Sequence, residues 1–367
     1  MRRLAARCPK DTEVEIYAHN RRHIPESLYR KCASSPIASE KDPSGKTVHS
    51  LAPIFIGLLF LQPLRLWQFP FLRRSGAFLF DKLFQFYRMA FLSRLEKIVS
   101  GADLVHCFST GYLARCTREA CMRKKIPLVQ NPPVHFGRWG DSPGQLNAYR
   151  MSDAVICFTE HFRSELISRI CGPLPRMEVI APVVEKPEIV QLANPPLNVP
   201  YVLFIGRREK HKGLMELTSA FKALNRPVKL VVAGPGPAVL QENVLDLGDV
   251  SEEKKKWLLA NCECLCVPSS DESFGIVYAE AMSYGKPVIA LDIAPVNEII
   301  LSNVCGLLLP SANPELIREA LETLLSDHEL RKKMGSAARN RFDEKYSPEV
   351  NVSKILHLYN DLVKKSQ

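Results

Sequence analysis

Several features that would place this chain outside the ordinary globular proteins are missing from its sequence. Residues 1–10 have no apolar centre, so we expect no secretory signal at the start of the chain. Internal repeats and long biased tracts are absent, and 46% hydrophobic with 24% charged residues is the composition of a folded protein. At 367 residues, the chain is long enough for two domains of roughly 150 to 200 residues each.

The usual metal-binding patterns are also missing. No Asp-x-Asp pair occurs, and no histidine or second cysteine pair stands at finger-like spacing from Cys262, Cys264 and Cys266. These three cysteines alternate with Glu263 and Leu265, so they would share one face of a strand, where we expect them to pack as small apolar groups. A metal site is the less favoured alternative. Eleven scattered cysteines, an odd number, favour a reducing cytoplasmic compartment.

Positive charge is concentrated at the start of the chain. Residues 1–100 hold 17 Lys and Arg against 8 Asp and Glu, a balance of +9 out of +10 for the whole chain. Such a basic region favours contact with an anionic surface, either lipid headgroups or nucleic acid. Because the region has no recognisable nucleic-acid recognition module or stacking motif, we expect no nucleic-acid partner.

The same region contains apolar segments that have two interpretations. Residues 47–64 carry no formal charge, but prolines and a glycine interrupt them, and they are too short to predict a membrane span. Residues 64–74 and 78–91 mix aromatic and aliphatic residues with Arg and Lys, as helices at a membrane surface do. We give two interpretations equal weight. One is peripheral contact with an anionic membrane, and the other is packing of a strand and helices inside the first domain.

Short β-branched or aromatic runs alternate with helical stretches along the chain, which predicts an α/β protein with parallel sheets. The predicted strands are 13–18, 104–108, 127–130, 154–158, 177–181, 201–205, 228–233, 244–247, 262–267, 287–291 and 306–309. The predicted helices of the second half are 214–224, 252–260, 275–284, 315–326, 328–342 and 350–363. Gly285 followed by Pro287 gives the helix before them a clear end.

A proline-rich segment interrupts this alternation and predicts two domains. We place the first domain at residues 1–185, the linker at 186–200 and the second domain at 201–345. The last helix, residues 346–367, is expected to pack back on the first domain.

Two carboxylates eight residues apart bracket a glycine turn in Glu272-Ser-Phe-Gly-Ile-Val-Tyr-Ala-Glu280. The turn follows a predicted strand and opens a helix, so free backbone N–H groups and the positive helix end at Gly275 suit a phosphate. A carboxylate on each side can hold neutral hydroxyls. The pattern therefore predicts a ligand that is part phosphate and part polyol, such as a nucleotide sugar.

A second motif follows the strand at 201–205, where Gly206-Arg207 precedes Lys212-Gly213. Ligands of open parallel sheets bind beyond the carboxyl ends of the strands, so this motif and the glutamate motif should face one cleft. Arg207 can grip phosphate oxygens as a fork, and Lys212 adds a mobile charge. The alternative is a solvated charge run, which is how residues 208–211 look.

The order of these motifs resembles glycosyltransferase family 4. The motifs are Gly206-Arg207, Lys212-Gly213, Ala233-Gly-Pro-Gly236, Gly248-Asp-Val250 and Pro268-Ser-Ser-Asp-Glu-Ser-Phe-Gly275. The resemblance is strong from Tyr201 to about Arg341 and loose in the first half. It implies the GT-B fold, in which two Rossmann-like, doubly wound domains face a central cleft.

The resemblance implies a role for each matching residue. Arg207 and Lys212 would bind the donor diphosphate, Glu272 the hydroxyls of the transferred sugar, and Glu280 the ribose. The remaining donor contacts would be Gly206, the backbone of Phe274, Gly275, Ile276 and Val277 at the phosphates, and Val250 at the base. From the residues alone, Glu272 could equally cap a helix, and Glu280 could be an exposed helical residue.

The first domain offers fewer matching residues. Asp103-Leu-Val-His-Cys-Phe108 resembles the family's strand that ends in His, and Asn131-Pro-Pro-Val-His135 follows another strand. His135 is the candidate catalytic residue near the reacting sugar, while a buried, partnered histidine is the alternative for both His106 and His135. We expect the family's first strand and glycine-rich loop to be missing before residue 13, either because the true start lies upstream or because this is a shortened form, and the resemblance therefore does not extend to acceptor binding and activity.

The resemblance implies a retaining glycosyltransferase of hexosyltransferase type, acting on a nucleoside-diphosphate sugar and a glycan or lipid-linked acceptor. With Arg207 and Lys212 at the diphosphate, no metal or other cofactor is required. A non-catalytic nucleotide-sugar-binding protein, a sugar-nucleotide epimerase and a phosphorylase that needs pyridoxal phosphate are the alternatives. The two glutamates superficially suggest a hydrolase, but their motif assigns them to binding.

Overall fold

The computed structural model describes residues 7–8, 13–18, 37–41, 47–51, 70–137 and 140–366, and for 16–18, 37–41, 47–51 and 70–82 the backbone alone. The chain forms two compact units. Unit 1 comprises Met1–Cys157, Ser164–Val179 and Val352–Gln367, and unit 2 comprises Phe158–Arg163 and Ile180–Asn351. The expectation about a first strand and glycine-rich loop concerns residues 1–12 and lies almost entirely outside the described residues.

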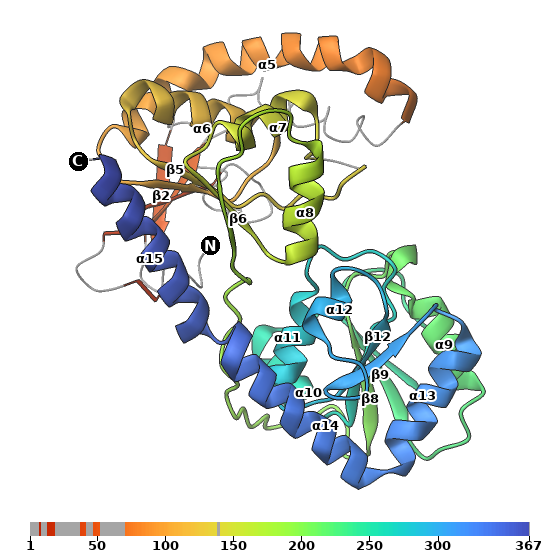
Figure 1. The fold of residues 1–367 in the computed structure, drawn as a ribbon. Helices are drawn as coiled ribbons and strands as arrows, with labels where there is room; N and C mark the ends of the chain where they lie inside the picture. Colours follow the sequence, from red (N-terminus) through yellow and green to blue (C-terminus); the bar gives the residue numbers. More distant parts are fainter. Residues whose placement is uncertain are drawn as a thin grey trace. The chain divides into compact units, whose positions relative to one another are not determined.

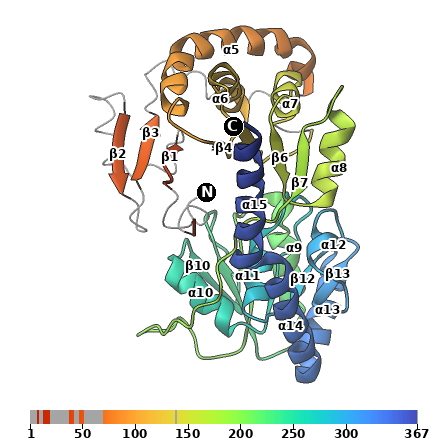
Figure 2. The same cartoon turned by 60° about the vertical axis from the view of Figure 1, so that its left-hand side comes forward.

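Unit 1 contains a parallel sheet in the order β4-β5-β6-β7 and a small sheet in the order β1-β3-β2, whose strands lie side by side in Figure 2. In the small sheet β1 is parallel and β2 antiparallel to β3. The sequence analysis did not predict β2 or a strand limited to β3. The elements of unit 1 that precede the linker are β1 Ile16–Ala18, β2 Ile37–Lys41, β3 Thr47–Leu51, α5 Pro70–Val99, β4 Val105–Cys107, α6 Gly111–Lys124, β5 Leu128–Gln130, α7 Pro143–Arg150, β6 Ala154–Cys157, α8 Glu160–Arg169 and β7 Arg176–Val179, with the first turn of α8 belonging to unit 2.

Helix α5 lies along α6 (Figure 1). Its side chains from residue 83 onward form one buried face that includes Phe84, Tyr87 and Phe91 and packs into a core with α6. For this part of the segment the structure supports packing inside the domain, although Phe86 is 60% exposed and Met89 is 76% exposed. The predicted apolar residues 52–69 lie outside the described residues. Within the described part of the chain, no helix combines the length and apolar character needed to cross a bilayer.

Unit 2 is built on a six-stranded parallel sheet in the order β10-β9-β8-β11-β12-β13. This is the doubly wound order, with α9 and α13 on one face and α10 and α11 on the other (Figure 1). Its elements are β8 Tyr201–Ile205, the 3₁₀ turn η2 Lys210–Lys212, α9 Leu214–Lys222, β9 Lys229–Ala233, β10 Val244–Gly248, α10 Glu252–Asn261, β11 Cys264–Cys266, α11 Ile276–Ser283, β12 Val288–Leu291, α12 Val296–Ile299, β13 Gly306–Leu309, α13 Pro314–Ser326, α14 His328–Arg341, the π-helical turn η3 Phe342–Tyr346 and α15 Pro348–Ser366, most of which returns to unit 1.

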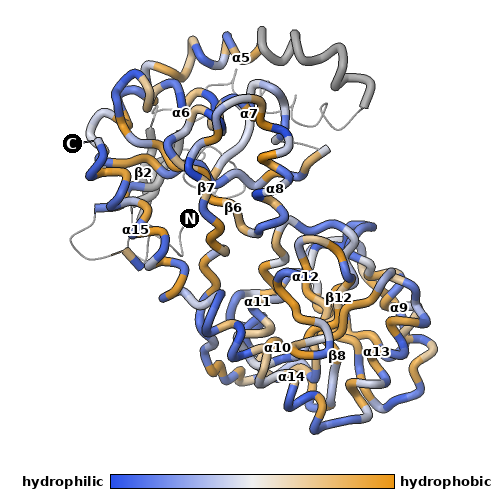
Figure 3. The backbone as a smooth tube through the Cα atoms, viewed as in Figure 1, coloured by the Kyte–Doolittle hydropathy of each residue, from blue (hydrophilic) through white to orange (hydrophobic). Residues whose placement is uncertain are grey.

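The helices of unit 2 begin and end at residues that the sequence marks clearly. The side chains of Ser251, Asn313 and Asp327 accept hydrogen bonds from the first turns of α10, α13 and α14. Helix α11 ends before Gly285, which has a positive φ of 65°. The central strands β8, β9, β11 and β12 are apolar and almost entirely buried, and they form the hydrophobic centre seen in Figure 3.

The structure corrects the interpretation of residues 208–211 as a solvated charge run at Arg208, while Glu209 and Lys210 are exposed. Arg208 is only 4% exposed and forms a bidentate ion pair with Asp246 of β10, with 2.6 Å between Arg208 Nη1 and Asp246 Oδ2. The backbone N–H groups of Val239 and Gly248 also donate to Asp246. Burial alone would raise the pKa of Asp246, but these hydrogen bonds and the Arg208 charge outweigh it and lower the pKa. The pair fastens the loop after β8 to the edge of the sheet.

Replacing Asp246 by Asn keeps the shape of the side chain but leaves Arg208 buried opposite a neutral amide. Because a broken buried pair leaves an uncompensated charge, we expect the free energy of unfolding to fall by roughly 3 kcal/mol. Folding lowers the pKa of Asp246, so the pair stabilises the fold above the unfolded-state pKa, and this stabilisation is lost as the pH falls through the folded-state pKa. The gap between wild-type and variant urea midpoints should therefore be full at neutral pH and shrink in acid.

The control is Glu315→Gln, which removes the carboxylate from an exposed ion pair with Arg318. This change should leave the urea midpoint nearly unchanged, because exposed pairs contribute little. An equal loss in both variants, or a gap that does not depend on pH, would contradict the assignment.

Candidate active site

The candidate site lies where the strand order of unit 2 changes direction. Strand β8 has β9 on one side and β11 on the other, and the chain runs outward from β8 in both directions. In such sheets the crevice for a ligand opens beyond the carboxyl ends of these two central strands. The loop 206–213 follows β8, and the loop 267–275 follows β11. These are the two loops that carry the predicted motifs.

The two loops are held in close contact. Gly213 has a positive φ of 69°, and a Cβ placed on it would lie 2.3 Å from the carbonyl oxygen of Pro268. In addition, the backbone N–H of Ser270 donates to the carbonyl oxygen of His211 at 2.8 Å. Only glycine fits at position 213, both for its backbone conformation and for the space available. The backbone of one loop is thereby fixed against the backbone of the other.

This contact brings Lys212 and Glu272 together. The distance between Lys212 Nζ and Glu272 Oε1 is 2.6 Å, and the two side chains are 14% and 10% exposed. Arg207, in contrast, is 59% exposed and forms its ion pair with Glu209. The structure therefore brings Lys212 beside Glu272, whereas the side chain of Arg207 is paired within its own loop.

Glu280 has a lysine partner of its own. The distance between Lys255 Nζ on α10 and Glu280 Oε1 on α11 is 3.1 Å, with both side chains about 15% exposed or less. Lys255 also pairs with Glu252 at 2.9 Å, so it lies between two carboxylates. The sequence analysis did not identify Lys255, because it stands in a run of three lysines that resembles a solvated helix face. Only the packing of α10 against α11 singles it out.

The turn between Glu272 and Glu280 has the geometry expected of an anion-binding helix start. Gly275 has a φ of 81°, and a Cβ there would lie 2.4 Å from the ring of Tyr278. Helix α11 begins at Ile276, which is exposed, followed by the half-buried Val277. Phe274 is buried in the hydrophobic core of unit 2. The first N–H groups of α11 carry the positive end of the helix dipole.

The carboxyl ends of β8, β9 and β10 also converge. A Cβ on Gly234 would lie 2.1 Å from the carbonyl oxygen of Gly206, and Gly234 N–H donates to Gly248 at 2.7 Å. Val250 follows two residues later, half-buried against the core of unit 2. Glycines at these positions allow backbone groups to line the predicted nucleotide side without intervening side chains.

The predicted residues of the first domain lie in unit 1. His135 is half-buried on the loop after β5. This loop is anchored by Asn131, whose side chain donates to the carbonyl of Ile156 at 2.8 Å and whose backbone N–H donates to Cys107. His106 is a different case: its Nδ1 contacts the Tyr359 hydroxyl, its ring stacks on Phe108, and burial lowers its pKa to about 3.

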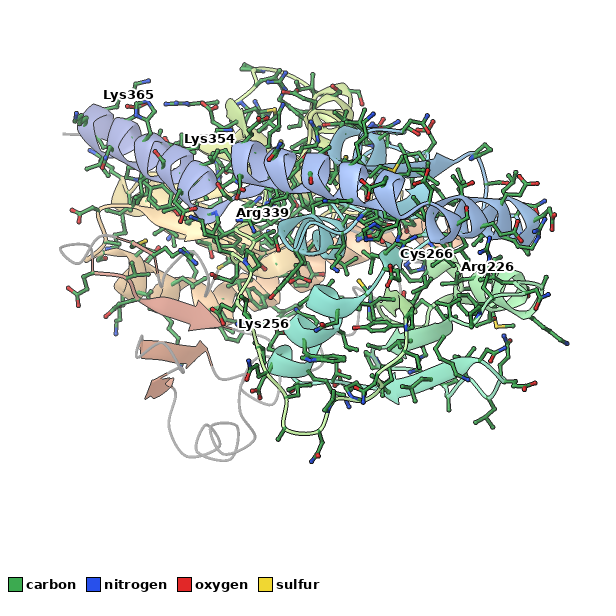
Figure 4. All side chains as sticks on the ribbon, turned by 90° about the horizontal axis from the view of Figure 1, so that it is seen from below. Arg226, Lys256, Cys266, Arg339, Lys354 and Lys365 are labelled. Carbon is green, nitrogen blue, oxygen red and sulfur yellow. The ribbon has the colours of Figure 1, made fainter. Side chains whose placement is uncertain are left out.

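The structure therefore supports the structural alternative for His106, which is a buried histidine with a partner inside the fold. Cys262, Cys264 and Cys266 are likewise buried core residues, and burial raises the pKa of each thiol. Cys266 is labelled in Figure 4. Among the described residues, no group of three or more His, Cys, Asp or Glu side chains could hold a metal ion.

Comparison with known proteins agrees with this geometry. Residues 185–341, which contain both loops, match the family model "Glycosyl transferases group 1". The alpha-D-kanosaminyltransferase of Streptomyces kanamyceticus is 25% identical over 306 residues, which cover 73% of this chain and 79% of that protein. The D-inositol 3-phosphate glycosyltransferase of Xylanimonas cellulosilytica is 27% identical over 64% of this chain, which spans 61% of that protein's length.

Solved structures of similar fold extend over both units. Sucrose-phosphate synthase from Thermosynechococcus elongatus matches 96% of this chain and 90% of its own, with a TM-score of 0.66 and 16% identity. Anabaena HepE in complex with UDP matches 74% of this chain and 82% of its own, with a TM-score of 0.63 and 18% identity. These likenesses confirm the predicted α/β fold with two parallel sheets, as in GT-B proteins. Residues 185–341, which contain both motif loops, thus match the group 1 glycosyltransferases, glycosyltransferase family 4, and the two units have the fold of GT-B proteins.

Proposed function

We propose that this chain transfers a sugar from a nucleoside-diphosphate sugar to a hydroxyl of a glycan or lipid-linked acceptor, a reaction of class EC 2.4, with retention at the anomeric carbon. The observation that carries the proposal is the Lys212–Glu272 pair, formed by the loops that follow the carboxyl ends of β8 and β11. A cation for phosphate and a carboxylate for hydroxyls stand there side by side. This is the combination that a ligand with a diphosphate and a sugar requires.

The chemistry assigned to these residues is electrostatic. Negative charge develops on the diphosphate as the bond to the sugar breaks, and fixed cations and N–H groups aimed at it lower the barrier. Lys212 and the start of α11 would supply that charge from positions the fold already holds. Arg207 would join them on exchanging Glu209 for a phosphate, and its exposure leaves it room to move. With these groups at the diphosphate, the proposal requires no metal or other cofactor.

The remaining roles divide between the two units. Glu272 would hold the hydroxyls of the transferred sugar, Glu280 the ribose and Val250 the edge of the base. His135 would act on the acceptor side, and the anchoring of its loop by Asn131 supports a defined position for it. A UDP-sugar is the first donor to test, because HepE structures contain UDP and UDP-glucose.

Two rival functions share the same site. A nucleotide-sugar-binding protein without turnover would bind the donor and release no sugar. An epimerase would convert the donor without any acceptor. Assays of sugar transfer and of donor conversion, each with and without acceptor, separate these activities from the proposed one.

Removing the Lys212 ammonium tests the diphosphate role. We expect Lys212→Met to bind UDP, or whichever of UDP, GDP and ADP stabilises the wild type most, about 10- to 100-fold more weakly, because a charge-assisted hydrogen bond is lost. The measurement is the rise in melting temperature with nucleotide concentration, followed by the rate of sugar transfer.

Lys210→Met is the matched control. Lys210 is exposed in the same short turn as Lys212, and the substitution removes the same charge. It should retain near wild-type binding. Equal nucleotide binding and turnover in Lys212→Met and wild type would remove the proposed role of Lys212.

We further propose that α5 contacts an anionic membrane surface, which suits a lipid-linked acceptor and peripheral association at the cytoplasmic face. Two observations support this. The large apolar side chains of Phe86 and Met89 lie exposed one helical turn apart, and residues 1–100 carry the balance of +9. Apolar side chains that insert at the headgroup boundary and basic residues that attract anionic lipids act together in such binding.

Flotation with phosphatidylserine-containing vesicles tests this contact. The wild type should float at low salt and less at high salt, and the double change Phe86→Ser with Met89→Ser should weaken binding by about tenfold or more. Met215→Ser is the control, because Met215 is 74% exposed but lies in unit 2. If the wild type stays unbound at low salt, α5 has only its packing role.

A further inference from the structure

The carboxylate proposed to hold the ribose does not stand alone. Glu280 Oε1 accepts from Lys255 Nζ at 3.1 Å, and the two side chains are 13% and 15% exposed. The two residues come from different helices, α11 and α10, which pack against each other. Lys255 is also held by Glu252, one turn earlier on α10, at 2.9 Å. The ammonium is therefore fixed from two sides at the back of the site.

A carboxylate near a diphosphate presents an electrostatic problem that this contact solves. Like charges in a partly desolvated site repel each other, and a half-buried carboxylate is costly unless it is paired. Lys255 compensates the charge of Glu280 and takes one of its oxygens in a charge-assisted hydrogen bond. Glu272 has the same kind of compensation from Lys212.

We propose that Lys255 is a positioning residue for ribose recognition, an inference that rests on the proposed function. Lys255 holds the Glu280 carboxylate in one orientation, so that this carboxylate accepts hydrogen bonds from the ribose hydroxyls. Lys255 itself touches only Glu280 and Glu252 in this role. It acts on the nucleotide through Glu280.

The preference for ribonucleotide over deoxyribonucleotide distinguishes this role from that of a lysine that only stabilises the fold. An ionised carboxylate only accepts hydrogen bonds. It can therefore bind a ribose hydroxyl, but this hydrogen bond is lost in a deoxyribose that lacks the hydroxyl. Sites built to hydrogen-bond a hydroxyl reject analogues that lack it. If Lys255 orients Glu280, its removal should reduce the preference for ribonucleotide over deoxyribonucleotide, and not simply weaken binding of both.

The experiment measures dissociation constants by titration calorimetry. The probes are the nucleoside diphosphate among UDP, GDP and ADP that stabilises the wild type most, and its 2′-deoxy and 3′-deoxy counterparts. We expect the wild type to prefer the ribonucleotide over at least one counterpart, and Lys255→Met to lose about tenfold in that preference, as for one hydrogen bond to a charged group. Lys255→Arg should restore most of it, because an arginine keeps the charge and a donor near Glu280.

Lys256→Met is the matched control. Lys256 is the next residue of α10 (labelled in Figure 4) and loses the same charge, but its partner is Glu188. It should keep the wild-type preference, and melting temperatures of all variants check the fold. A Lys255→Met protein that keeps the preference, or loses affinity for all probes equally, overturns this inference and leaves the proposed function standing. A wild type that binds none of the three nucleotides overturns both.

Discussion

The candidate site depends on one steric constraint, the close approach of the loops that follow β8 and β11. Gly213 has no room for a side chain beneath the carbonyl of Pro268, and Ser270 donates to His211 beside it. Because these contacts join backbone to backbone, the distance between the loops does not depend on flexible side chains. A lysine at the end of one loop and a glutamate in the other then meet without further adjustment, which is the form of preorganisation that electrostatic catalysis requires.

The balance of charge at the candidate site suits the ligand proposed for it. A diphosphate needs cations, whereas sugar and ribose hydroxyls are well held by carboxylates, and both kinds of group must share a small volume. The fold meets both needs by giving each carboxylate a lysine, Lys212 for Glu272 and Lys255 for Glu280. Arg208 and Asp246 form a similar pair at the edge of the sheet, where it holds the loop after β8.

Sequence patterns predicted the strands of both parallel sheets and the longer helices of unit 2, but not β2 of the small sheet. Strands such as 201–205 and 306–309 were placed correctly because they are continuous apolar runs bounded by glycine or proline, and the motif glycines stand at turns that only glycine fits. The burial of Arg208 and the role of Lys255 could not be predicted. Both depend on a partner more than 20 residues away, and a run of charged residues does not show which member faces inward.

The buried thiols of β11 give this architecture a built-in chemical reporter. Only a thiolate reacts readily, and burial holds Cys264 and Cys266 protonated as well as out of reach. Strand β11 is hydrogen-bonded to β8 and β12 and leads directly into the loop that carries Glu272. Once the accessible thiols, Cys171 and Cys8 among them, have been blocked, modification of these two sulfurs requires the separation of β11 from its neighbours. The rate at which these two cysteines are modified therefore reports whether the parallel sheet of unit 2 is intact.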